Sequence, residues 1–332
     1  MSLKPAKITA SQGLSANKSP GQNLRGILLP FPTPFRQDGE LNFSGLRSNI
    51  EKWNETGVAG YVALGSTGER VHLEESERLK VIETARAAVP EEKAFIVGGG
   101  QPSTRATIIE ARRLAEAGAD ALLLLTPCFY RAAMTQSALY SYYMAVAESA
   151  PLPLLLYSMP ELTGIAIAPE TIARLSEHEN IVGLKDSAGD IINFAETLRL
   201  AREDFAVLTG NGPLLYAALA AGATGGILAV GCVAARLALK IYRAVRAGEH
   251  ERASAWQRRL TPLGLAVTKR YGIGGLKAAL DMIGFTGGHV RAPLQDATEE
   301  ARQEIARLLE ACSSVEELTE RDERYRLAGA TE

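Results

Sequence analysis

A barrel of eight parallel β-strands, each followed by an α-helix, is the fold that this chain of 332 residues predicts. From Arg25 onward, short apolar runs alternate about eight times with longer stretches of helical periodicity. The runs are continuously apolar, as strands buried on both faces must be, and this indicates a parallel sheet. The competing open doubly wound sheet needs a phosphate loop after its first strand, and residues 32–42 carry no G-x-G-x-x-G motif.

The predicted strands are short runs that stop at Gly, Pro or polar residues, where strands usually end. In chain order they are GILLPF (26–31), GYVALG (60–65), KAFIVGGG (93–100), ALLLLTP (121–127), PLLLYSMP (153–160), IVGLKDS (181–187), FAVLTGN (205–211) and GGILAVG (225–231).

Helical periodicity fills the gaps between these runs, and several helices begin with suitable residues. Ser103 and Thr135 can cap a first turn, and Pro169 suits the first turn itself. The clearest helical segments are 75–89, 103–118, 135–149 and 169–178. We therefore assign residues 25–247 to the (β/α)8 barrel.

The two ends of the chain lie outside this barrel. Helical periodicity returns from Gly248 to Cys312 with no linker before it, so residues 248–332 are expected to form a helical extension packed on the barrel. Residues 1–24 are basic and rich in Ser and Gly, which is typical of a flexible tail. A cytoplasmic protein is expected, or a mitochondrial one if residues 1–24 act as a transit peptide.

Composition points to a small-molecule ligand. The net charge of -2 gives no reason to expect nucleic acid, and no apolar stretch is long enough for a membrane span. Three widely spaced cysteines, Cys128, Cys232 and Cys312, argue against a disulfide framework and fit a reducing compartment.

Lys185 ends an apolar run, where an ammonium must be neutralised, paired or used. Active sites of such barrels lie at the carboxyl ends of the strands. Lys185 and Ser187 are two residues apart and point the same way, whereas Asp186 points to the opposite side; if Lys185 and Ser187 face inward, the ammonium enters the barrel mouth. Desolvation there favours a nucleophilic amine suited to Schiff-base chemistry on a ketone, and an ion pair at the barrel rim is the alternative.

Further polar residues end neighbouring strands. Tyr157 can exchange a proton beside such an amine, or its hydroxyl can simply face water. The GSTGE segment (65–69) offers backbone N–H groups and the hydroxyls of Ser66 and Thr67 as a neutral cradle for a carboxylate, with an ordinary glycine turn as the alternative.

The sequence lacks the residue patterns that metal-dependent enzymes and serine hydrolases need. The histidines have no paired ligand spacing, and no serine lies in a G-x-S-x-G elbow. We therefore expect no metal or other cofactor. The scattered histidines are His72, His178, His250 and His289.

Five motifs, in order along the chain, carry a resemblance to a known family. They are PFPTPFRQDGELN, GSTGE, TPCFY, YSMPELTG and GLKDSAGD. Together they resemble the dihydrodipicolinate synthase and N-acetylneuraminate lyase family of pyruvate-dependent aldolases, which form a lysine Schiff base. The resemblance covers residues 25–310 and implies a TIM barrel and a lyase activity that needs no metal.

The resemblance also implies roles for matching residues. Lys185 is implied to attack the keto carbon of pyruvate or of a pyruvate-containing substrate, and Tyr157 to move a proton at the bond made or broken. Ser66 and Thr67 are implied to bind the pyruvyl carboxylate, and the backbone of Gly210 to line the pocket.

The choice among family members depends on the second substrate. Leu162 stands where the synthases are expected to carry an arginine for a carboxylate, and leucine cannot replace that contact. Neuraminate lyases share the leucine but carry an acidic pair where this chain has Asn211 after Gly210. The segments TPCFYR, LYSMP, NIVGLKDSAGD, AVTKRYGIGGLK and RAPLQ look most like 4-hydroxy-2-oxoglutarate aldolases. Side chains around Leu162, Asn211 and Cys232 are expected to set the aldehyde specificity.

One position departs from the family pattern. Phe129 stands where many relatives carry a tyrosine that reaches across a dimer interface into the neighbouring site, and Tyr130 is the candidate replacement in the proton relay. By analogy with the family, a homo-oligomer, either a dimer or a tetramer, is expected.

The sequence thus predicts a Schiff-base aldolase that cleaves 4-hydroxy-2-oxoglutarate to pyruvate and glyoxylate. A dihydrodipicolinate synthase, which joins pyruvate to aspartate semialdehyde, and a 2-keto-3-deoxy sugar acid aldolase are the alternatives. A barrel that binds a keto acid without turning it over is the alternative of another class; Phe129 favours it, and Lys185 and Tyr157 oppose it.

Overall fold

The computed structural model describes residues 24–312, which contain a closed barrel of eight parallel strands. The strands follow one another around the barrel in chain order, and β8 closes the ring by pairing with β1. Each predicted run contains one strand, so the predicted (β/α)8 fold is confirmed. The strands are β1 Gly26–Pro30, β2 Gly60–Ala63, β3 Ala94–Gly99, β4 Ala121–Leu125, β5 Leu154–Ser158, β6 Ile181–Asp186, β7 Ala206–Thr209 and β8 Gly225–Ile227.

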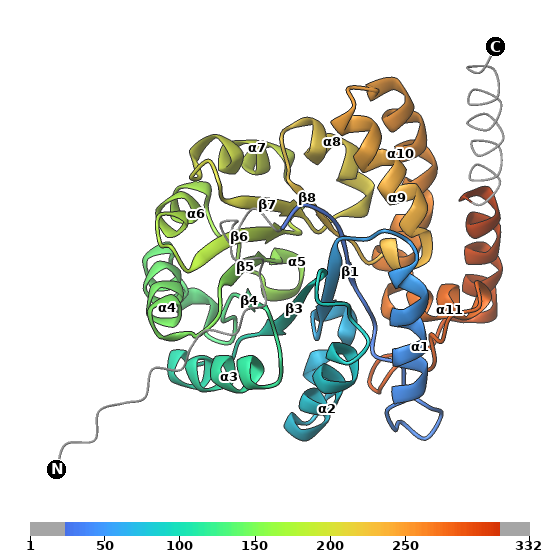
Figure 1. Ribbon diagram of the computed structural model, residues 1–332, viewed down its shortest axis with the longest axis horizontal. Coiled ribbons are helices and arrows are strands. Elements are labelled where there is room, and N and C mark those ends of the chain that lie inside the picture. Colours follow the sequence, from blue (N-terminus) through green and yellow to red (C-terminus); the bar gives the residue numbers. More distant parts are fainter. Residues whose placement is uncertain (1–23, 313–332) are drawn as a thin grey trace.

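A ring of helices surrounds the strands, as Figure 1 shows. The predicted helix starts are confirmed: the Ser103 hydroxyl accepts from the Ala106 N–H at 3.2 Å, and Thr135 accepts from Ala138 at 3.2 Å. The helices of this ring are α1 Phe43–Asn54, α2 Glu75–Arg86, α3 Thr104–Glu116, α4 Gln136–Ser149, α6 Pro169–Ser176, α7 Ile191–Leu200, α8 Leu215–Ala220 and α9 Gly231–Arg246.

The apolar core has two layers, one on each face of the barrel sheet. Inward-facing side chains such as Val62, Ile96 and Leu155 fill the barrel interior. Outward-facing side chains pack against the helices, with Trp53 of α1 among the largest that are fully buried. Both faces of each strand are therefore apolar, which explains the continuous runs in the sequence.

The C-terminal part of the chain adds helices outside the ring. They are α10 His250–Leu265, a π-helical turn Ala266–Arg270, α11 Gly272–Met282 and a last helix at 299–312. Helix α10 packs along α9, and α11 lies to the same side of the barrel (Figure 1). The Asn49 side chain of α1 also exchanges two hydrogen bonds with the backbone of Thr286, each 2.8 Å long.

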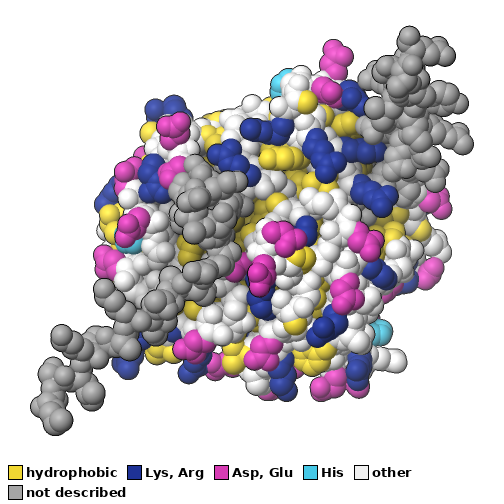
Figure 2. Space-filling view, viewed as in Figure 1, with side chains coloured by type: hydrophobic (Ala, Val, Ile, Leu, Met, Phe, Trp, Pro, Cys, Tyr) yellow, Lys and Arg dark blue, Asp and Glu magenta, His cyan; other side chains and the backbone are white. Residues whose placement is uncertain are grey.

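Part of the predicted ends cannot be compared with the structure. Residues 1–23 of the predicted tail and residues 313–332 of the predicted extension lie outside the described residues. None of the helices between residues 24 and 312 combines the length and the apolar character that a membrane crossing requires. Acidic and basic side chains are scattered together over the face shown in Figure 2, in keeping with the small net charge.

Candidate active site

A cavity of about 620 Å³ opens where the barrel strands end. Strand ends, the loops that follow them and the C-terminal helices all contribute to its wall. The structure thus brings together, from several different strand ends, almost all the residues that the sequence predicts for the site. Those that line the cavity are Ser66, Thr67, Tyr157, Leu162, Lys185, Ser187, Gly210 and Asn211.

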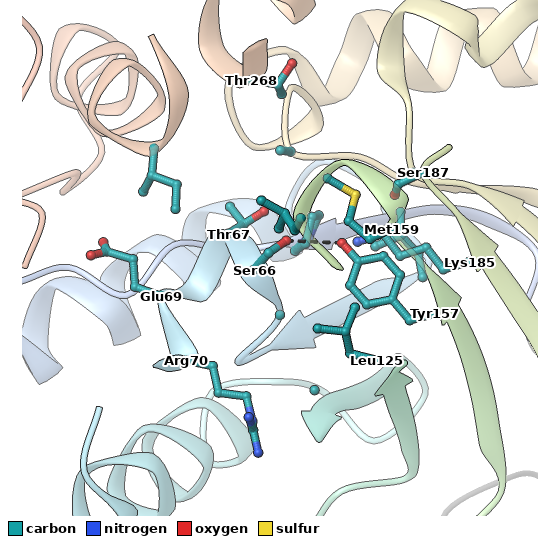
Figure 3. Close-up of a pocket in the computed structure, with 18 of the residues that line it drawn as sticks. Ser66, Thr67, Glu69, Arg70, Leu125, Tyr157, Met159, Lys185, Ser187 and Thr268 are labelled. Atoms are coloured by element: carbon teal, nitrogen blue, oxygen red, sulfur yellow. Dashed lines mark hydrogen bonds between the residues drawn. The ribbon is translucent and has the colours of Figure 1, made fainter. Parts of the chain in front are cut away.

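Lys185 lies near the end of β6, directly across the β5–β6 pairing from Tyr157. It is only 3% exposed, and its Nζ lies 4.3 Å from the centre of the Tyr157 ring (Figure 3). Ser187 lines the same cavity and Asp186 does not, as the alternation of a strand predicts. The amine therefore projects into the cavity and not to the outer rim.

Tyr157 is buried beside this amine with its hydroxyl in contact with a second candidate residue. Its Oη lies 3.1 Å from Ser66 Oγ, the contact drawn in Figure 3. Burial raises the pKa of Tyr157, but the positive charge of Lys185 and polar contacts with Ser66, Lys185 and Ser187 outweigh burial and hold the pKa below its ordinary value. A phenol in this state gives up its proton more readily at neutral pH.

The carboxylate cradle predicted from GSTGE is a tight turn at the cavity wall. Ser66–Gly68 forms a single 3-10 turn, so its first N–H groups have no partner within the turn. The Thr33 hydroxyl donates to the Gly68 carbonyl at 2.7 Å and fixes the end of the turn. Backbone N–H groups and the Ser66 and Thr67 hydroxyls can together bind an anionic group here by donating hydrogen bonds to it.

A buried ion pair lies behind this turn and is not among the contacts predicted from the sequence. Glu69 adopts the left-handed region with φ 53°, and its Oε1 lies 2.5 Å from Lys277 Nζ of α11. Its other oxygen accepts from the Arg291 backbone N–H at 3.0 Å and lies 3.4 Å from His72 Nδ1. The signal was available, because Lys277 interrupts the apolar segment GLKAAL much as Lys185 interrupts its strand. The C-terminal extension thus anchors the turn that carries Ser66 and Thr67.

Gly210 has a steric reason to be glycine. A Cβ atom there would lie 1.9 Å from Ser187 Oγ and 3.0 Å from Lys185 Cε. Any side chain would therefore displace the amine and its neighbour. The Gly210 N–H also donates to the Asp186 carbonyl at 2.5 Å, which ties β6 to the residue that follows β7.

Three predicted positions lie elsewhere. Phe129 and Tyr130 do not line the cavity of their own chain and are 78% and 71% exposed, with their rings edge to face. Cys232 lies outside the cavity wall, buried within α9, where its carbonyl accepts from Trp53 Nε1 at 3.0 Å, and the expectation that side chains around it help to set the aldehyde specificity stays a prediction.

No set of three or more His, Cys, Asp or Glu side chains in residues 24–312 is arranged to hold a metal ion. His72 is the histidine of the cavity wall, and its contact is with Glu69.

Asp186, on the opposite side of β6 from the cavity, gives a prediction on stability. Burial, with a smaller contribution from Asp190, raises its pKa to about 6 although the Ala188 N–H donates to it at 2.7 Å. The folded state thus binds the proton more tightly than the unfolded chain, so Asp186 costs stability as pH rises from its ordinary pKa towards 6, and the full cost persists above that. Asp186→Asn keeps an acceptor for Ala188 and should raise the free energy of unfolding at pH 7 by about 1–2 kcal/mol.

Urea unfolding at pH 7 and pH 4 tests this prediction. The gain should shrink at pH 4, where the wild-type carboxyl is largely protonated in the folded state. An equal gain at both pH values would contradict the assigned cause.

Known proteins resemble this chain over nearly all of the residues that the structure describes. A profile of the Dihydrodipicolinate synthetase family matches residues 23–312. A 4-hydroxy-tetrahydrodipicolinate synthase of Methanothrix thermoacetophila is 35% identical over 294 residues, which cover 88% of this chain and 98% of the relative. A solved monomeric dihydrodipicolinate synthase variant superposes with a TM-score of 0.84 at 30% identity, covering 89% of this chain and 98% of that one. A prophage protein of E. coli from the same family, solved in complex with pyruvate, gives a TM-score of 0.81 at 27% identity, with coverage of 87% and 99%.

Proposed function

The chain belongs to the dihydrodipicolinate synthetase family of pyruvate-dependent lysine Schiff-base lyases, and we propose that it condenses pyruvate with aspartate semialdehyde through Lys185. The observation that carries the proposal is the buried Lys185 amine beside the Tyr157 hydroxyl in one cavity. Because members of this family are enzymes, the alternative of a barrel that only binds a keto acid is set aside.

The proposed steps use four residues that line the cavity, Lys185, Ser66, Thr67 and Tyr157. The Lys185 amine attacks the keto carbon of pyruvate, and loss of water leaves a protonated imine. Ser66 and Thr67 hold the pyruvyl carboxylate. A proton leaves the methyl carbon to give an enamine, and this carbon attacks the aldehyde. Tyr157 gives its proton to the aldehyde oxygen as the new carbon–carbon bond forms. The amino group of the second substrate then displaces Lys185 and closes the ring.

The protonated imine supplies the electron sink of this reaction, so the proposed chemistry requires no metal or other cofactor. A homo-oligomer also remains part of the proposal, by analogy with the family alone.

The choice of aldehyde rests on the relatives. The synthase of Methanothrix thermoacetophila and that of Syntrophus aciditrophicus, at 35% and 36% identity, are both named for the reaction with 4-hydroxy-tetrahydrodipicolinate as product. The preference for 4-hydroxy-2-oxoglutarate drawn from the motifs has no support in these relatives. It stays a second candidate because Leu162, 61% exposed in the cavity wall, stands where the synthases are expected to carry an arginine.

Mass spectrometry after incubation with pyruvate and borohydride tests the proposal. One reduced pyruvyl group per chain, mapped to the peptide that contains Lys185, is the expected result. Parallel assays of condensation with aspartate semialdehyde and of cleavage of 4-hydroxy-2-oxoglutarate then choose between the two substrates. No adduct, or an adduct mapped to another lysine, would refute the assignment of Lys185.

Tyr157→Phe should lower kcat by about 10²- to 10⁴-fold, because the proton for the aldehyde oxygen is lost. The pyruvate adduct should still form, since the amine is unchanged. Tyr140→Phe is the matched control; Tyr140 lies on α4, where Arg174 stacks on its ring, and outside the cavity wall. Steady-state kinetics of both variants check this, and a Tyr157→Phe enzyme within tenfold of wild type would remove Tyr157 from the proton transfer.

A further inference from the structure

We propose that Lys269 binds a carboxylate of the aldehyde partner, so that the site prefers an aldehyde that carries a carboxylate to one that carries none. This inference rests on the proposed function and names the class of its second substrate. It assigns the recognition to a residue of the C-terminal extension and not to the strand-end loops.

Lys269 reaches the cavity because the helix that carries it is irregular. The π-helical turn Ala266–Arg270 joins α10 to α11, and three consecutive residues of it, Val267, Thr268 and Lys269, line the cavity. Such turns are rare and are often found at functional sites. Figure 3 shows Thr268 on the side of the cavity that the C-terminal helices form, above Ser66 and Tyr157.

The other cationic side chains of the cavity wall are already engaged. Arg70 pairs closely with Glu110 of α3 and extends away from Tyr157 in Figure 3. His72 contacts Glu69, and Lys185 is the proposed nucleophile. Lys269 Nζ lies 3.7 Å from Glu161 Oε2, which is too long for a hydrogen bond. Both side chains of that pair are about half exposed, at 53% and 56%, so the ammonium is available to an incoming anion.

The Lys269 ammonium lies near the short helix on which Leu162 provides no positive charge. Glu161 and Leu162 are neighbours on the short helix α5, Pro160–Thr163, which follows β5 and therefore Tyr157. Lys269 contacts Glu161 of that helix, so a cation from the C-terminal extension lies next to the helix that carries Leu162, and both residues line the cavity. A carboxylate bound there would be held on the side of the cavity where Tyr157 meets the aldehyde.

Kinetics with aldehydes of different charge test the inference. Wild type, Lys269→Ala and Lys269→Arg are assayed at saturating pyruvate with aspartate semialdehyde, glyoxylate and glyceraldehyde. Lys269→Ala should lower kcat/KM by about tenfold for the two aldehydes that carry a carboxylate, aspartate semialdehyde and glyoxylate, and leave glyceraldehyde, which carries none, within twofold. Lys269→Arg should recover most of the loss. Arg270→Ala is the matched control, because the neighbouring Arg270 pairs with Glu304 and lies outside the cavity wall.

The outcomes separate this inference from the proposed function. Failure of wild type to form a borohydride-trapped pyruvate adduct would refute the proposed function itself. Two results would overturn the role of Lys269 alone if wild type forms the pyruvate adduct normally. One is a kcat/KM of Lys269→Ala that equals that of Arg270→Ala, and the other is a loss of kcat/KM with glyceraldehyde as large as that with the other two aldehydes. Preference of wild type for glyceraldehyde would overturn it as well. Glu161→Gln gives a second readout, because removal of the competing carboxylate should lower KM for glyoxylate.

Discussion

Lys185→Ala is expected to lower kcat/KM by at least about 10³-fold and to abolish the borohydride-trapped pyruvate adduct. Of the two lysines among residues 24–312 that line the cavity, Lys185 is the one whose ammonium lies against the Tyr157 ring, so Lys269 cannot take its part without rebuilding the cavity. Intact mass and steady-state kinetics on the same preparation measure both effects.

Lys185→Arg shows whether Lys185 acts as a nucleophile or only as a positive charge. Arginine keeps a positive charge beside Tyr157 but is not deprotonated in proteins, so it cannot form the imine. We expect this variant to be as inactive as Lys185→Ala. Lys80→Ala, at an exposed position of α2, should behave as wild type. Activity retained in Lys185→Arg would indicate that the lysine serves as an ion-pair partner and would contradict the Schiff-base assignment.

The barrel itself can be predicted from sequence because its signal is local and repeated. Each strand is buried on both faces, so each run is apolar throughout, and eight such runs with helices between them leave few alternatives. The position of the site follows from the fold, since residues that end parallel strands meet at one mouth. The sequence alone therefore predicts that Lys185, Tyr157 and Ser66 lie close together.

Contacts made by the C-terminal extension could not be predicted in this way. Arg291 meets Glu69 across a sequence separation of 222 residues, and no periodicity encodes such a pairing. The π-helical turn that brings Lys269 to the cavity also departs from the regular helical period that the sequence predicts between Gly248 and Cys312. The place of Cys232 within α9 and outside the cavity wall is likewise not specified by its position in the sequence.

The pair formed by Glu69 and Lys277 gives the largest expected effect on stability. Their side chains are 0% and 1% exposed, and the ammonium also donates to the His289 carbonyl at 2.6 Å and lies 4.5 Å from the centre of the Phe35 ring. Lys277→Met fills a similar volume but leaves the Glu69 carboxylate buried without its partner. The free energy of unfolding should fall by about 3–5 kcal/mol, as is found when one member of a buried pair is removed. Urea denaturation measures it.

The double variant Glu69→Gln with Lys277→Met shows whether the loss belongs to the pair. The introduced glutamine would keep an acceptor for the Arg291 N–H and carry no charge, so the double variant should regain much of the stability that Lys277→Met loses. Because Glu69 directly follows the turn that bears Ser66 and Thr67, KM for pyruvate should rise in the single variant and recover in the double one. Two results would contradict the view that this ion pair holds the turn of Ser66 and Thr67 in place. One is a loss in the free energy of unfolding below about 1 kcal/mol in Lys277→Met, and the other is a loss in the double variant that exceeds the sum of the losses in the two single variants.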